Sequence, residues 1–313
     1  ERERMEGVFM DAWEHTAYLA KETFDVVVHG AAQETTFQSK GFSTPTEVAV
    51  LGIICLFNII VCKIAEVTVF RLLAKLFLRK KKNLVSFLFS CRECTYYSVS
   101  LYCCYRVFGK ERWLYDLKYL WTLMENLETK PAQKFLYLVE LSWYLCGIFR
   151  LCTEPRKKDF KQMLVHHAST IGLIGFSYKL HMLRIGVVIY TLHNISDPLL
   201  QAAKLFKYCG SDRGATGLFV PFALSFFVSR LILFPMLCYY TIFYGPGYQR
   251  QQLYKQEAFS MVLLVLLIPI HMYWFYLIVR IAIKSIAKGT TDDDRSDSED
   301  DEYVDTTTKK KQK

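Results

Sequence analysis

Seven apolar runs, each long enough to cross a lipid bilayer, restrict the fold of this chain more than any other feature. A membrane-spanning helix needs roughly 20 predominantly apolar residues. The chain has 313 residues, 52% of them hydrophobic, and gathers them into such runs. We therefore predict an all-α polytopic membrane protein with about seven transmembrane helices. The expected spans are residues 48–67, 84–108, 132–151, 163–180, 183–206, 217–244 and 258–283.

Basic residues beside these runs predict the topology. One cluster follows the first span, one precedes the fourth, one ends the fifth and one follows the seventh. In an alternating seven-span chain all four fall on one side, which the positive-inside rule makes cytosolic. The amino end is then lumenal and the carboxyl end cytosolic. This placement accounts for the net charge of +9 without a nucleic-acid partner.

The segments outside the apolar runs contain fewer features that predict structure or function. The first 45 residues lack a signal-peptide pattern, so the first run is expected to act as the membrane anchor itself. Residues 292–302 form a dense acidic block that cannot bury apolar surface and is expected to be disordered. Ser296 and Ser298 each have an acid three residues later and are expected phosphorylation sites. The alternative is a tail that only confers solubility.

Three histidines and one aspartate lie inside the fourth and fifth runs, where ionisable groups are costly and therefore suggest a functional site. His166 and His167 point about 100° apart on a helix, so one can enter a central chamber while the other lines an adjacent wall. His193 and Asp197 share a face of a continuous helix. A short connection makes the two runs antiparallel neighbours. Thr170 is close enough to orient either ring of the histidine pair.

This arrangement predicts a buried imidazole cluster with one carboxylate. An imidazole can accept and return a proton near neutral pH or attack an activated acyl group, and a carboxylate can orient it. A zinc or iron site is the competing interpretation, although membrane di-iron oxygenases need more histidines, and we expect no metal. His271 and Trp274 are expected to line the same chamber, with an interfacial aromatic belt as the alternative for Trp274. Glu140 and Arg230 are expected to face the bundle interior or to be paired.

Several of these residues resemble a known motif. Residues 156–160 (Arg-Lys-Lys-Asp-Phe), the pair His166–His167 and the stretch from His193 to Asp197 resemble the Lag1 motif of ceramide synthases, members of the TLC (TRAM-LAG1-CLN8) domain family. The last span, around residues 271–278, and the acidic tail are also similar to parts of that family. The likeness runs from about residue 83 to residue 302.

The resemblance implies an enzyme of the endoplasmic-reticulum membrane that acts in sphingolipid biosynthesis. It would be an acyl-CoA-dependent sphingosine N-acyltransferase, which transfers a fatty acyl group to the amine of a sphingoid base. Six helices would enclose a chamber, with the first span outside it. The implied domains are a lumenal segment (1–47), the first span with its basic linker (48–82), the TLC domain (83–288) and an acidic cytosolic tail (289–313).

The resemblance also implies roles for individual residues. The catalytic residues would be His166, His167, His193 and Asp197, supported by Asn194, Ser196 and Thr170. The phosphates of acyl-CoA would meet Arg156, Lys157, Lys158 and Lys161, and His271 and Trp274 would contact substrate. The acyl chain would lie in the chamber, whose depth would set the preferred length. Acyl-CoA is a co-substrate, no cofactor is bound, and the partners are the sphingoid base, membrane lipid and a second synthase in a homodimer or heterodimer.

Two positions depart from the family pattern. Asn194 stands where the family usually has aspartate, and Gln201 stands where glutamate is common. Asparagine can form hydrogen bonds but cannot stabilise an imidazolium as an anion does. The departure motivates two rival functions: an inactive homologue that regulates active synthases, and a non-catalytic TLC protein that senses or moves lipid or assists translocation.

Overall fold

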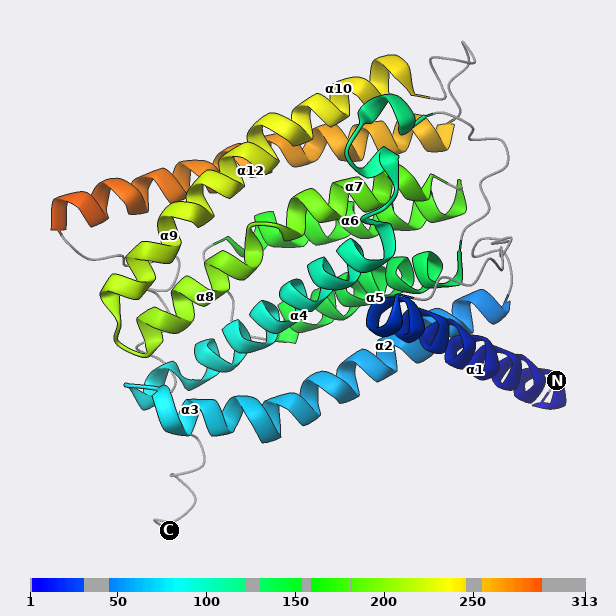
Figure 1. Ribbon diagram of the computed structural model, residues 1–313, viewed down its shortest axis with the longest axis horizontal. Coiled ribbons are helices and arrows are strands. Elements are labelled where there is room, and N and C mark those ends of the chain that lie inside the picture. The colour runs from blue at the N-terminus through cyan, green and yellow to red at the C-terminus, as the bar shows by residue number, and fades with distance from the viewer. Residues whose placement is uncertain are drawn as a thin grey trace.

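The computed structural model describes residues 2–30, 45–121, 130–153, 159–180, 182–245 and 255–288 (Figure 1). Within these ranges every regular element is a helix. The prediction of an all-α architecture is therefore confirmed.

Most of the predicted spans correspond to helices with bounds close to those expected. The first is α2 (Pro45–Ala65), which continues through a π-helical turn, η3 (Glu66–Phe70), into α3 (Arg71–Phe77). The second, third and fourth are α4 (Leu84–Phe108), α5 (Pro131–Thr153) and α6 (Phe160–Lys179). The last two are a rod made of α9 (Asp212–Phe226), π-helical η8 (Phe227–Leu233) and α10 (Phe234–Tyr244), and the long helix α12 (Lys255–Lys288).

The fifth predicted span is not one helix. It is divided at Ile195 and Ser196 into α7 (Leu183–Asn194) and α8 (Asp197–Tyr208). Pro198 lies in the first turn of α8, where its missing N–H and its ring do not disturb a helix, whereas further along a continuous helix they would. The expectation that His193 and Asp197 share one helical face is therefore wrong, because they belong to different helices.

Among the described residues, four helical rods are long and apolar enough to cross a membrane: Pro45–Phe77, Pro131–Thr153, Asp212–Tyr244 and Lys255–Lys284. The first of them is 33 residues long with a mean hydropathy of 2.6 in its most apolar window. Several such helices in one chain make it a multi-pass membrane protein. The total of seven spans stays a prediction.

The helices lie side by side in a bundle (Figure 1). Helix α6 packs between α5 and α12, and α7 contacts both α4 and α6. Two groups of buried apolar side chains fill the bundle. One is centred on α5 and α7 and includes Tyr137, Leu138 and Val187. The other joins the α9–α10 rod to α12 and includes Phe234 and Leu267.

A helix precedes the first span, where the sequence predicted none. It is α1 (Arg2–Phe24), which lies against α2 and α5 near the start of both (Figure 1). Lys134 of α5 is fully buried there, with its Nζ 2.7 Å from Glu47 Oε1 and 3.1 Å from His15 Nε2. Tyr178 of α6 donates a hydrogen bond to Glu47 Oε2. This polar network connects α1, α2, α5 and α6.

Candidate active site

Four histidines from three helices meet in the middle of the bundle. The ring centre of His166 lies 5.8 Å from that of His167, 5.8 Å from that of His193 and 6.2 Å from that of His271. The indole of Trp274 lies 5.1 Å from the same ring. His166, His193 and His271 are buried. The prediction that imidazoles of the fourth and fifth spans converge is confirmed, and α12 adds a further ring.

The hydrogen bonds of these rings determine where their protons lie in the neutral state. His193 Nδ1 is 2.7 Å from the carbonyl oxygen of Ile189. A carbonyl oxygen only accepts, so Nδ1 carries the hydrogen and Nε2 carries the lone pair. His193 Nε2 lies 3.0 Å from His271 Nε2, so His271 must donate. Its own Nδ1, like that of His166, is buried and has no hydrogen-bond partner among the described residues.

His167 occupies a separate position on the wall of the cluster. Its Nδ1 is 3.0 Å from the carbonyl oxygen of Met163, so the same reasoning leaves Nε2 as its basic nitrogen. The ring packs directly on α5, where a Cβ added to Gly147 would lie 2.9 Å from His167 Cδ2 and 3.0 Å from His167 Nε2. Tyr144 of α5 lies within 5.5 Å of the same ring. The glycine therefore provides the space that the imidazole fills.

The carboxylate of Asp197 binds an arginine. Nη2 of Arg230 lies 3.1 Å from each carboxylate oxygen of Asp197 and 2.5 Å from the carbonyl oxygen of His193. Arg230 comes from the π-helical segment η8 and is buried. It thus fastens the end of α7 to the start of α8 across the helix break. Asp197 is connected to His193 through this guanidinium.

A second buried carboxylate lies beside the cluster. Glu140 of α5 accepts hydrogen bonds from Tyr96 and Ser100 of α4, at 2.9 and 3.1 Å. It also accepts one from the side-chain amide of Asn194, at 2.9 Å. Both Glu140 and Asn194 are almost fully buried. The amide that replaces the family's usual aspartate is therefore used to hold a carboxylate.

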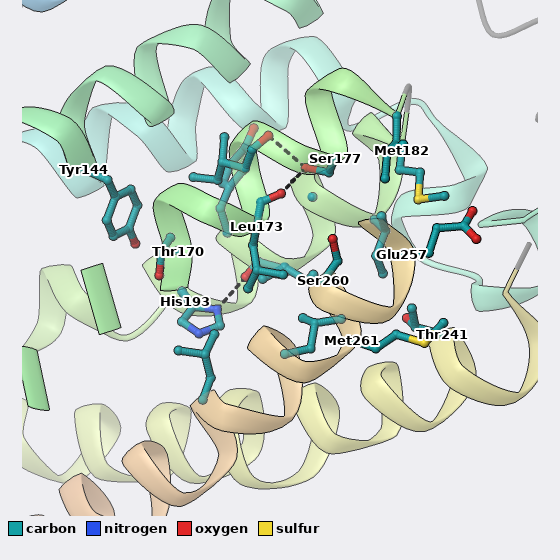
Figure 2. Close-up of a pocket in the computed structure, with 18 of the residues that line it drawn as sticks. Tyr144, Thr170, Leu173, Ser177, Met182, His193, Thr241, Glu257, Ser260 and Met261 are labelled. Atoms are coloured by element: carbon teal, nitrogen blue, oxygen red, sulfur yellow. Dashed lines mark hydrogen bonds between the residues drawn. The ribbon is translucent and has the colours of Figure 1, made fainter. Parts of the chain in front are cut away.

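A cavity lies between the two groups of apolar side chains. His193, Thr170 and Tyr144 lie at one end of it, and Met182, Thr241 and Glu257 lie at the other (Figure 2). Between these ends its wall is mainly apolar. The predicted chamber is present, and it reaches the histidine cluster.

The cavity extends in one direction only. Its lining residues on α6 all follow His166, those on α7 do not go past His193, and those on α12 all precede His271. The three helices alternate in direction, so all of these residues lie on the same side of the histidine layer. Lys161, in the first turn of α6, lies on the opposite side and is exposed.

Comparison with known proteins agrees with the motif. A family model described as the TLC domain matches residues 87–280, a range that contains all four clustered histidines. The chain belongs to the TLC domain family.

Relatives of the chain are named ceramide synthases. It is 40% identical over 190 residues to ceramide synthase 4 of Mus musculus, covering 60% of this chain and 48% of the relative. Ceramide synthase 5 of Homo sapiens is 38% identical over 208 residues, with coverages of 63% and 50%. Ceramide synthase LOH2 of Arabidopsis thaliana is 34% identical over 217 residues, with coverages of 65% and 71%. The chain spans about half the length of the mammalian relatives. The resemblance inferred from the motif is confirmed.

The other residues that the sequence predicted for the site of this TLC domain have the following positions. The hydroxyl of Thr170 donates a hydrogen bond to the backbone carbonyl oxygen of His166, at 2.8 Å. It therefore orients the helix backbone, whereas the sequence predicted that it would orient a histidine ring. Ser196 is fully buried at the helix break. His271 and Trp274 contact the cluster but do not line the cavity. Arg156, Lys157, Lys158, Ser296 and Ser298 lie outside the described residues.

Two side chains of the TLC domain site are more central than the sequence indicated. Glu140 and Arg230 were noted only as charges inside apolar runs, yet they hold Asn194 and Asp197. Their position in hydrophobic spans was the available signal, because a charge there usually has a specific partner. Among the described residues, no group of three or more histidine, cysteine or acidic side chains has a geometry that could hold a metal ion.

Proposed function

We propose that this TLC domain protein is a ceramide synthase, which transfers a fatty acyl group from acyl-CoA to the amine of a sphingoid base. The observation that carries the proposal is the position of the histidine layer between an apolar cavity on one side and the basic start of α6 on the other. Acyl-CoA has three parts in the matching order: an apolar chain, a reactive thioester carbonyl and an anionic nucleotide. When the chain fills the cavity and the nucleotide lies at the start of α6, the carbonyl lies at the imidazoles.

The chemistry requires a base at this level. A sphingoid amine resembles that of lysine and is protonated at neutral pH, so it must lose a proton before it attacks the thioester. We assign this step to the pair His166 and His167. An imidazole accepts the ammonium proton and releases it to water. The amine nitrogen then attacks the carbonyl carbon, and the imidazole accepts the second proton, which the nitrogen loses as the carbon–nitrogen bond forms. The carbon–sulfur bond breaks, and the imidazolium gives this second proton to the departing thiolate. In the covalent variant an imidazole first accepts the acyl group and then passes it to the amine.

The polar partners of the cluster support this assignment. His193 and His271 share a hydrogen bond, and Arg230 holds Asp197 against the end of α7. These contacts fix the ring positions, and a misplacement of about 1 Å can lower a rate 100-fold. We assign Asp197 and His193 to positioning and charge balance in the site.

The location of the reaction follows from the same proposal. The basic clusters, including Lys161, support a cytosolic entrance for acyl-CoA and a cytosolic carboxyl end. We propose that the protein lies in the endoplasmic-reticulum membrane. Ser296 and Ser298 remain proposed phosphorylation sites of its tail, and a homodimer or a heterodimer with another synthase remains a proposed assembly.

The contacts of the described residues do not favour the regulatory rival. That rival was motivated by the missing carboxylate at Asn194. The side chain of Asn194 is bound to Glu140 and Ser100, so the substitution removes no anion from an imidazole in this fold.

The test is ceramide formation by membranes that express the full chain, supplied with a sphingoid base and acyl-CoA. We expect His166→Ala and His167→Ala to abolish the product, and His29→Ala, which removes a histidine outside the site, to leave the rate unchanged. Incubation with labelled acyl-CoA alone separates the two chemical variants, because only the covalent one leaves label on the protein. Wild-type rates in both active-site variants, at equal protein levels, would refute the assignment.

A further inference from the structure

We propose that Asn194 is a permanently neutral hydrogen-bond donor to Glu140, and that this pair positions His193 even at alkaline pH, where two carboxyl groups in these places would repel each other. Glu140 is then a positioning residue of the site, which acts through the end of α7. The inference rests on the proposed function and specifies how a reacting ring is held. The sequence indicated only that Asn194 lacks the charge of an aspartate.

Glu140 is a buried carboxylate surrounded by donors. Its side chain is 2% exposed. It accepts hydrogen bonds from the hydroxyls of Tyr96 and Ser100 and from the amide of Asn194. All three donors are neutral groups. A carboxylate that is removed from water keeps its charge only where such donors replace the water, so each of the three contacts matters.

The amide of Asn194 is used for its N–H groups. Nδ2 lies 2.9 Å from Glu140 Oε1 and 3.3 Å from Ser100 Oγ. The amide oxygen, Oδ1, is buried and has no hydrogen-bond partner among the described residues. A carboxylate accepts hydrogen bonds and does not donate them, so Glu140 requires a donor at this position. The nitrogen of Asn194 supplies it.

This pair holds the end of α7. Asn194 is the last residue of α7, and His193 directly precedes it. On the other side, Arg230 donates a hydrogen bond to the carbonyl oxygen of His193, at 2.5 Å. Because α7 ends here, these two contacts do what a following helical turn would do in a continuous helix. His193 is thus held between an anion in α5 and a cation in η8.

A carboxyl group at position 194 could donate to Glu140 only while it kept a proton. Two buried carboxyl groups about 3 Å apart do not both ionise, so they hold one proton between them near neutral pH. In alkaline solution the pair loses this proton, and the two anions repel each other. The amide of asparagine does not ionise. The contact between Asn194 and Glu140 therefore does not depend on pH.

The other titratable groups around Glu140 do not alter this argument. They are Tyr97 and Cys104 of α4, Tyr137 and Tyr144 of α5, Tyr190 of α7 and Asp197 of α8. Tyrosine and cysteine are neutral near pH 7, and the charge of Asp197 is paired with Arg230. All of these groups are present in the wild type and in the variants below, so their effects cancel when rates are compared.

The experiment measures kcat for ceramide formation from pH 7 to pH 9, by the wild type and by Asn194→Asp. Above the pH at which the carboxyl pair loses its proton, the rate of the variant relative to the wild type should fall by up to about tenfold for each pH unit. Adding Glu140→Gln to Asn194→Asp moves the neutral donor to α5, so the double variant should follow the wild-type profile. A ratio that stays constant from pH 7 to pH 9, or a double variant that declines like the single one, would overturn the inference.

Asn58→Asp is the matched control. Asn58 of α2 also packs on α5, where it donates a hydrogen bond to Ser142. This variant makes the same chemical change without placing the new carboxyl group against Glu140. It should keep the wild-type pH profile. A decline equal to that of Asn194→Asp would contradict the role of the pair, because any added carboxyl group would then have the same effect.

The thermal midpoint in detergent tests the pair without ceramide formation. In folded Asn194→Asp the pair keeps a proton that the unfolded chain has already released at neutral pH, so the stability of this variant should fall as the pH rises. If the chain makes no ceramide with any acyl-CoA but this midpoint falls relative to the wild type, the proposed function is wrong and the contact is as described. If ceramide is made at a ratio that does not change with pH, the function holds and the inference fails.

Discussion

Replacing Gly147 by alanine should separate catalysis from stability. Gly147 lies in α5, and an alanine Cβ there would approach His167 to 2.9 Å at Cδ2 and 3.0 Å at Nε2. Ordinary contacts begin at about 3.4 Å, so the ring must move by roughly 0.5 Å. Because the imidazole is a short side chain that is hydrogen-bonded to Met163, this movement changes where its basic nitrogen points.

The substitution makes two opposing contributions to the free energy of unfolding. Alanine is about 1 kcal/mol better than glycine inside a helix. A weakened hydrogen bond from His167 to Met163 costs about 1 kcal/mol, so the free energy of unfolding should be nearly unchanged. Catalysis has no such compensation. A displacement approaching 1 Å can cost about 100-fold, so we expect kcat to fall by about 10-fold to 100-fold.

The assay compares kcat for ceramide formation with the thermal midpoint of the purified protein in detergent. Gly175→Ala is the matched control, since Gly175 lies in the same helix as His167 and nothing surrounds the position of its Cβ within 4 Å. It should keep full activity and gain up to about 1 kcal/mol of stability. Full activity of Gly147→Ala at unchanged stability would refute the view that the ring of His167 must occupy this position.

Three further predictions concern the polar contacts. Arg230→Gln should cost about 3 kcal/mol, because it leaves the carboxylate of Asp197 without its cation; thermal unfolding in detergent measures the loss, and a wild-type midpoint would contradict it. Lys134→Met should cost a similar amount by removing the partner of buried Glu47, and the double variant with Glu47→Gln should recover part of it in the same assay. Burial and the nearby Lys134 ammonium lower the pKa of His15 below 6.5. The unfolded chain then binds the proton more tightly, so the packing of α1 should be complete above about pH 6.5 and weaken as the pH falls below it; limited proteolysis of α1 should accelerate at acid pH in the wild type and not in His15→Gln.

The local sequence was sufficient to predict most of the helices. Apolar runs of bilayer length predicted α2, α4, α5 and α6 with bounds within a few residues of the observed ones, because a long hydrophobic run can satisfy its backbone only as a helix in lipid. The exception was the break at Ile195 and Ser196. Pro198, three residues after Ile195, was a signal for the break, but hydropathy alone does not detect it.

The sequence also determined which residue types could carry chemistry. Histidines inside apolar spans suggest a functional site by default, and the adjacent positions of His166 and His167 meant that the two rings could not face the same point. Both conclusions depend on local spacing along a single helix, which the sequence contains directly.

Only the tertiary structure decided how these groups are connected. The partner of Asp197 is thirty-three positions away in η8, and the carboxylate that holds Asn194 is fifty-four positions away in α5. The bond between His193 and His271 joins α7 to α12. Such contacts depend on how helices pack against one another, and their spacing along the chain carries no periodic signal. The position of the cavity is of the same kind, because helices that are distant along the chain, among them α6, α7 and α12, line it together.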